Sequence, residues 1–187
     1  MRLFVKRCRK DLPAPSNSQL ALRLNGMKKL VLIRHAHSPG GDARFSDHER
    51  PLSQRGIGDA QKMGRRFFEK KIFPERFYVS DSVRTHTTAM LIAKELGDAE
   101  SEVVPDRALY NTEADSYFQV IREIAPVVNV AGVVGHNFTI SRMLTLLTGA
   151  EGYEMSPCSV AIVSCEIENW SEIHPRCGVL TEIFEPE

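Results

Sequence analysis

The chain has 187 residues, 42% of them hydrophobic, so it can bury a sizeable core, and its length suits one domain better than two. Lysine and arginine total 24, as do aspartate and glutamate, which leaves no net positive charge for binding nucleic acid through its phosphates. No apolar run approaches the roughly 18 residues of a membrane span. The four cysteines have neither the spacing of metal ligands nor the density of a disulfide-rich secreted domain. Together these features predict a cytoplasmic protein without nucleic-acid or membrane partners.

The charge is unevenly distributed along the chain. Residues 1–26 carry six basic residues and one acid, so residues 27–187 carry 18 basic and 23 acidic residues, a net charge of −5. The first 26 residues show no sustained period and contain a loop-like DLPAPSNSQ stretch. We predict a basic extension over 1–26, disordered or from a non-native start, and a single domain over 27–187. An organelle-targeting segment is the alternative, which the prolines disfavour.

The predicted elements begin with a strand over residues 30–33, whose continuous apolar run is typical of a strand covered on both faces. A helix follows over residues 51–68, with apolar residues at helical spacing and Ser53 as its N-cap. A short strand over residues 76–80 then leads to a second helix over residues 83–96.

The second half of the chain continues this alternation. We expect helices over 117–124 and 139–147 and strands over 127–136, 159–167 and 179–185. Strands alternating with helices predict an α/β fold, a three-layer α/β/α sandwich with a largely parallel central sheet. Ligands in such sheets bind beyond the carboxyl ends of the strands.

Three predicted strands end near residues whose side chains could act in catalysis or bind an anion. Arg34 and His35 follow the first strand, Arg84 comes shortly after the second, and His136 ends the third. If these strands are neighbours, two arginines and two histidines meet in one crevice, and we expect no acidic residue of the same motifs to neutralise them there. Uncompensated positive charge is costly unless an anion occupies the site. A phosphoryl group is the natural candidate, because arginine forks match its oxygens bidentately.

These segments belong to an ordered set of motifs between residues 28 and 186. The motifs are LIRHAHS, PLSQRGIGDA, SDSVRTHTTA, VVGHNFTIS and GVLTEIFEP. On these motifs the chain resembles the histidine phosphatase superfamily, with its phosphoglycerate mutase-like fold, and in particular the small SixA-like phosphohistidine phosphatases. Each motif is weak alone, whereas the ordered set is specific.

The resemblance implies a role for each of the four residues. His35 is the expected nucleophile, because a neutral imidazole has a lone pair near pH 7. Arg34, Arg84 and His136 are expected to surround the transferring group, and His136 is also expected to be protonated or to donate a hydrogen bond to it. No metal or other cofactor is expected, since two guanidinium groups supply the charge that Mg²⁺ would bring.

Four further residues are candidates for contacting the substrate. His37 lies two residues after His35 on an extended segment and could face the same way, and Ser38 could cap or touch the phosphate. Asn137 lies where the helix after His136 is expected to start. Glu113 lies between the second and third motifs, where the mutase and phosphomonoesterase branches of the family carry a carboxylic acid that protonates the departing alkoxide.

The substrate prediction depends on whether such an acid is needed. SixA-like enzymes manage without one, because the imidazole that leaves phosphohistidine is easily protonated. Only 49 residues separate His35 from Arg84 and 52 separate Arg84 from His136, which leaves no room for a large insertion over the site. We therefore predict a phosphatase acting on phosphohistidine in a protein partner, such as a phosphotransfer domain. The alternatives are a small-molecule phosphomonoesterase with Glu113 as general acid and, less favoured, a non-catalytic phosphate-binding module.

Overall fold

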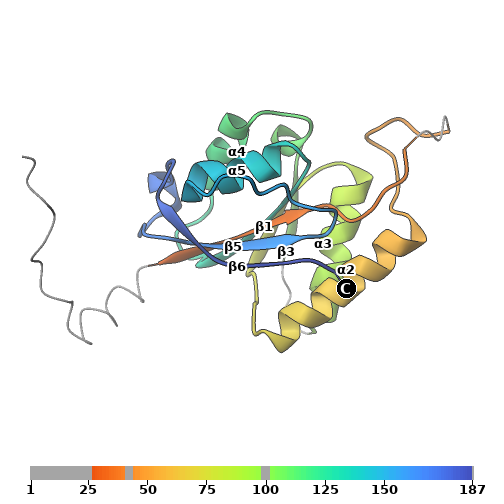
Figure 1. The fold of residues 1–187 in the computed structure, drawn as a ribbon, viewed down its shortest axis with the longest axis horizontal. Coiled ribbons are helices and arrows are strands. Elements are labelled where there is room, and N and C mark those ends of the chain that lie inside the picture. Colours follow the sequence, from red (N-terminus) through yellow and green to blue (C-terminus); the bar gives the residue numbers. More distant parts are fainter. Residues whose placement is uncertain (1–26, 41–43, 98–101, 187) are drawn as a thin grey trace, which may run out of the picture.

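A computed structural model describes residues 27–40, 44–97 and 102–186, so the predicted extension over residues 1–26 lies outside the described residues (Figure 1). The strands are β1 (Lys28–Arg34), β2 (Arg76–Ser80), β3 (Glu102–Asp106), β4 (Val130–Gly135), β5 (Val160–Cys165) and β6 (Gly178–Phe184). The helices are α2 (Gln54–Glu69), α3 (Val83–Glu95), α4 (Ala114–Arg122) and α5 (Thr139–Thr148), with short 3₁₀ helices η1 (Arg107–Leu109) and η2 (Trp170–Glu172).

The strands of the described chain form one sheet in the order β3-β2-β4-β1-β5-β6. The first four strands of that order run parallel, whereas β5 and β6 are antiparallel to their neighbours. The predicted largely parallel sheet is therefore confirmed. Strand β3 was not predicted; it is a short edge strand that contains Pro105, a residue that sheets tolerate at an edge.

The helices cover both faces of this sheet. In Figure 1, α4 and α5 lie on one side of the strands and α2 and α3 on the other. Leu30 and Leu32 of β1 join the core beneath α4 and α5, while Val31 and Ile33 join the core beneath α2 and α3. This alternation explains the continuous apolar run of β1, because both of its faces are buried. The predicted three-layer α/β/α sandwich is confirmed.

The sheet order brings the predicted motifs together. Strands β2, β4 and β1 are adjacent and parallel, so their carboxyl ends meet at one edge. The register pairs Arg34 with Gly135, and the backbone N–H of His35 donates to the carbonyl of Gly135 at 3.1 Å. The last residues of β1 and β4 are thus fixed beside each other. Within the described chain, no helix has the length and apolar character to cross a membrane.

Candidate active site

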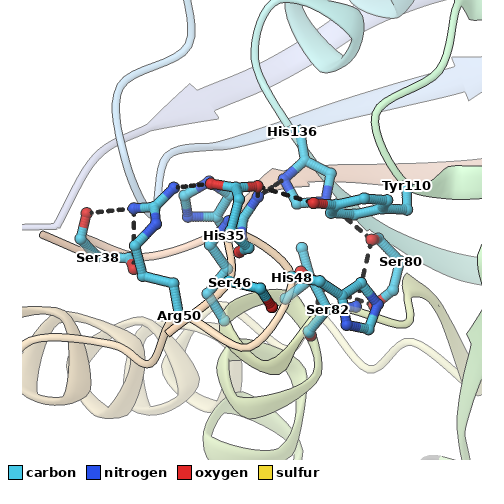
Figure 2. Close-up of polar contacts among 12 residues, drawn as sticks. His35, Ser38, Ser46, His48, Arg50, Ser80, Ser82, Tyr110 and His136 are labelled. Carbon is cyan, nitrogen blue, oxygen red and sulfur yellow. Dashed lines mark hydrogen bonds and ion pairs between the residues drawn. The ribbon is translucent and has the colours of Figure 1, made fainter. Parts of the chain in front are cut away.

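A cavity of about 390 Å³ lies at this edge of the sheet, and all four predicted catalytic residues line it: Arg34, His35, Arg84 and His136. Figure 2 shows the side chains of His35 and His136 close together, with Tyr110 and Arg50 beside them. The ring centroids of the two histidines are 5.3 Å apart in an edge-on arrangement. The predicted convergence of these side chains on one place is therefore observed in the structure.

His35 has one ring nitrogen free for chemistry. Its Nδ1 lies 2.8 Å from the carbonyl oxygen of Ala36. A carbonyl can only accept, so Nδ1 carries the proton and Nε2 carries the lone pair. Burial, with a smaller contribution from nearby guanidinium groups, lowers the pKa of His35 to about 4. The ring is therefore a neutral base with Nε2 unprotonated at neutral pH.

His136 has the opposite tautomer. Nη2 of Arg84 lies 3.1 Å from its Nδ1 and must donate to it, because guanidinium has no lone pair to offer. The remaining nitrogen, Nε2, carries the proton and lies 2.8 Å from Oγ of Ser80. Burial, and then the positive charge of Arg84, lower the pKa of His136 to about 3. In the free site the ring donates to Ser80, a residue whose part in the site the sequence did not reveal.

The two predicted arginines are held by backbone and side-chain acceptors. Nη1 of Arg34 donates to the carbonyl of Met155 at 2.7 Å, and Arg84 donates to the backbone carbonyl of Asp47. The Nε atoms of both arginines are buried and have no hydrogen-bond partner. Buried donors usually find a partner. Both arginines line the cavity, so their positive charge is available to an anion bound there.

An acid from outside the predicted motifs, Asp47, accompanies these arginines. Asp47 lines the cavity, and its carboxylate accepts from Nη2 of Arg84 at 3.0 Å, from Nη2 of Arg50 at 2.8 Å and from the hydroxyl of Tyr110 at 2.9 Å. The hydrogen bond from Arg50, with that from Tyr110 and the charge of Arg84, holds the pKa of this carboxyl well below its usual range. Asp47 lies in a turn segment without hydrophobic periodicity, so no sequence signal pointed to it.

Arg50 is a third guanidinium group of the cavity that sequence reasoning missed. It directly precedes Pro51, the first residue of the second motif, and that position was the available signal. Its Nη1 donates to the carbonyl and the hydroxyl of Ser38, at 2.9 and 3.1 Å. Arg50, shown beside Ser38 in Figure 2, therefore connects the segment after His35 to Asp47.

Three of the candidate substrate contacts also line the cavity. Nδ1 of His37 lies 2.8 Å from Oγ of Ser53, and the hydroxyl of Ser38 donates to the carbonyl of Pro51 at 2.6 Å. The side-chain amide of Asn137 donates to Glu154 at 3.2 Å. All three side chains thus already have partners within the protein.

Glu113 is placed differently from these residues. It is exposed, occupies the N-cap position of α4 without a capping hydrogen bond from its side chain, and does not line the cavity. The helix after His136 begins at Thr139, the first residue of its predicted range, so Asn137 lies two residues before the helix. In the described chain, no group of three or more His, Cys, Asp or Glu side chains is placed to hold a metal ion.

Residues 30–124, about half of the chain, match the family described as the histidine phosphatase superfamily, branch 1. The chain belongs to the histidine phosphatase superfamily. This match includes the motifs that contain Arg34, His35 and Arg84, and His136 follows in the part of the chain beyond it.

Known proteins of similar sequence or fold extend this finding. An uncharacterized chloroplastic protein of Arabidopsis thaliana is 26% identical over 159 residues, covering 81% of this chain and 72% of its own length. The protein histidine phosphatase SixA, solved with tungstate, superposes with a TM-score of 0.71 at 19% identity, covering 84% of this chain and 97% of its own. A mycobacterial glucosyl-3-phosphoglycerate phosphatase superposes with a TM-score of 0.64 at 14% identity, covering 86% of this chain and all of its own. Family and neighbours together indicate a phosphatase enzyme.

Proposed function

We propose that this protein is a phosphohistidine phosphatase that removes phosphate from a histidine side chain of a protein partner. His35 is the nucleophile, and Arg34, Arg84 and His136 surround the phosphoryl group. This assignment rests on the neutral His35 ring with a free Nε2, placed in a cavity with three guanidinium groups. Donors fixed in advance around the equatorial oxygens supply most of the stabilisation that phosphoryl transfer needs.

The reaction proceeds in two steps through a phosphorylated His35. The lone pair on Nε2 attacks phosphorus, and the bond from phosphorus to the substrate's imidazole nitrogen breaks, with the electron pair staying on that nitrogen. Because the other nitrogen of the substrate ring is already protonated, the ring leaves as neutral imidazole. Water then attacks phosphorus and the bond to Nε2 breaks. Dihydrogen phosphate leaves with both water protons, and His35 returns to its neutral form with the proton on Nδ1.

The proposed substrate class rests on whether a carboxyl group at the cavity can donate a proton to the leaving group. Asp47 is the one carboxylate among the described residues that line the cavity, and its three donors keep it ionised. Asp47 is more than half exposed, so its carboxylate is ionised at neutral pH even without these donors and cannot protonate a leaving group. Glu113 lies outside the cavity. An alkoxide leaves poorly without a proton donor, whereas imidazole leaves as a neutral molecule. The site therefore favours phosphohistidine over a phosphate ester.

A protein partner fits the surroundings of the cavity. Phe138 follows the cavity residue Asn137 and is 79% exposed, and Tyr153 is also exposed. Exposed aromatic side chains are enriched where proteins bind one another. The similarity in fold to SixA, a protein histidine phosphatase, supports the same substrate class.

The deciding experiment compares phosphate release from a phosphohistidine-bearing protein with release from a small phosphate ester, using wild type, His35→Ala, Glu113→Gln and His174→Ala. We expect release from phosphohistidine only, its loss in His35→Ala, and wild-type rates in the other two variants. His174 is exposed, and its Nδ1 lies 2.9 Å from the carbonyl of Pro175, so it is the matched control for removing a histidine.

Other results would point elsewhere. Faster turnover of the ester, lost in Glu113→Gln, would favour the phosphomonoesterase alternative. Anion binding without any turnover would favour a phosphate-binding module. Activity that survives in His35→Ala would rule out the proposed nucleophile.

For the compartment we propose the cytoplasm, where thiols stay reduced. The described cysteines Cys158, Cys165 and Cys177 are all buried and free. The Arabidopsis relative is named as chloroplastic, so an organelle is the competing location. Imaging of the tagged full chain in its own cell separates the two: a diffuse cytosolic signal agrees with the proposal, and an organellar signal contradicts it.

A further inference from the structure

We propose that Asp47 is an internal anion: its carboxylate occupies the donors of Arg50, Arg84 and Tyr110 in the free enzyme, and the phosphoryl group displaces it on binding. This inference rests on the proposed function, because it assumes that the cavity takes a phosphoryl group. It makes Asp47 a specificity-determining residue of the site.

The geometry around Asp47 is that of a bound anion. One carboxylate collects hydrogen bonds from two guanidinium groups and a phenol, at 2.8, 3.0 and 2.9 Å. These donors come from three separate parts of the chain, namely the segment before α2, the first turn of α3 and the segment after η1. Convergence of such donors on one point is how proteins bind phosphate.

The carboxylate can leave more easily than its partners can. The Asp47 side chain is 58% exposed, whereas that of Arg84 is only 5% exposed. A half-exposed carboxylate regains water when it rotates outward, so its release costs little solvation energy. Arg84 stays in place, because it also donates to His136 and to the backbone carbonyl of Asp47.

The charges at the cavity explain why a phosphoryl group displaces the carboxylate of Asp47. Arg34, Arg50 and Arg84 bring three positive charges to the cavity, and Asp47 returns one negative charge. A phosphoryl group carries roughly −1.5 to −2 at neutral pH and has three acceptor oxygens, so it gains more from the same donors than a carboxylate does. A singly charged anion would only replace the single negative charge of Asp47 by another single negative charge, with no gain in attraction to the arginines. Asp47 thus selects doubly charged anions.

The test is a calorimetric titration with tungstate at neutral pH, using wild type, Asp47→Asn and Glu49→Gln. Asparagine keeps the shape of the side chain but competes weakly for guanidinium, so we expect Asp47→Asn to bind tungstate about tenfold more tightly. Glu49 is an exposed acid two residues away that does not line the cavity, so Glu49→Gln makes the same charge change and is expected to bind within about twofold of wild type. Thermal melts of all three proteins check folding.

Each outcome decides the inference. Tighter binding in Asp47→Asn alone supports displacement, and a crystal structure with tungstate should then show Asp47 withdrawn from Arg84. Weaker binding in Asp47→Asn would mean that Asp47 only positions the arginines, and equal gains in both variants would mean a long-range charge effect; either result overturns the inference while the proposed function stands. No tungstate binding by any of the proteins would overturn the proposed function together with it.

Discussion

Nη2 of Arg84 lies 3.1 Å from Nδ1 of His136, and this contact places the imidazole proton on Nε2, which donates to Ser80 at 2.8 Å. His35, whose ring centroid is 5.3 Å away, carries its proton on Nδ1 instead. The two facing imidazoles are thus both neutral and of opposite tautomer. One offers a lone pair to phosphorus, while the other is oriented by partners on both sides.

The first prediction concerns Ser80→Ala. The substitution leaves the buried Nε2–H of His136 without its acceptor, which should lower the free energy of unfolding by about 1–3 kcal/mol. The ring would also lose its orientation, so we expect kcat to fall on the order of tenfold. Ser82 is equally buried and shares a hydrogen bond with Thr85 at 2.7 Å, so Ser82→Ala is the control. Equal losses of kcat in both variants would show that Ser80 has only a structural role.

The second prediction concerns the pH dependence of stability. The pKa of His35 is about 4 in the folded protein and about 6.5 when unfolded, so the unfolded chain binds the extra proton between these values. Stability is therefore full above pH 6.5 and falls as the pH drops toward 4. The charged and titratable groups that share the cavity with His35 are Arg34, His37, Asp47, Arg50, Arg84 and His136.

Urea unfolding at pH 7 and pH 5 measures this effect. Between these two values wild type should lose about 2 kcal/mol more stability than His35→Gln, which has no group to protonate there. The exposed His174 provides the control, and His174→Gln should follow wild type. Identical losses in wild type and His35→Gln would contradict the lowered pKa.

The third prediction concerns Arg84→Lys. Lysine keeps the charge but cannot bridge His136 and Asp47 at once, as the fork of Arg84 does. Loss of one preorganised donor at a transferring group costs about 10²–10³-fold in kcat. Arg107 is exposed, and its guanidinium lies over the ring of Tyr110, so Arg107→Lys serves as the comparison, with kcat near wild type. A fall of less than about threefold in Arg84→Lys would argue against its place beside the phosphoryl group.

Much of the fold was predictable because local patterns specify it. These patterns involve only residues that are close together in the sequence. They are the apolar run of β1, the helical spacing of apolar residues in α2 and α3, and the glycine at the end of α5. Strand β3 escaped prediction because it lies at the edge, is only partly buried and contains Pro105. Helix α4 begins three residues before its predicted start at residue 117, because Glu113, at its N-cap position, is not one of the residue types that mark a helix start.

The cavity residues that could be predicted lie at the ends of strands or shortly after them. Arg34 ends β1, and His35 and His136 directly follow β1 and β4, so these residues meet because the two strands are neighbours in the sheet. Asp47 and Tyr110 lie 63 residues apart and touch through a loop conformation that no periodicity specifies. Long-range contacts between loops depend on the folded backbone, so sequence patterns do not report them.

The last prediction compares two glycines of the same helix. A Cβ on Gly56 would lie 2.1 Å from the carbonyl oxygen of His37, whereas a Cβ on Gly58 would meet no atom within 4 Å. Gly56→Ala must therefore displace the segment after His35 or the start of α2, at a cost of about 1–3 kcal/mol or more, with a loss of activity because that segment lines the cavity. Gly58→Ala should instead stabilise the protein by about 0.5–1 kcal/mol, because alanine is the better helix former. Thermal unfolding and phosphate release on both variants check this. If Gly56→Ala were as stable and as active as Gly58→Ala, the close approach of α2 to His37 would not constrain the site.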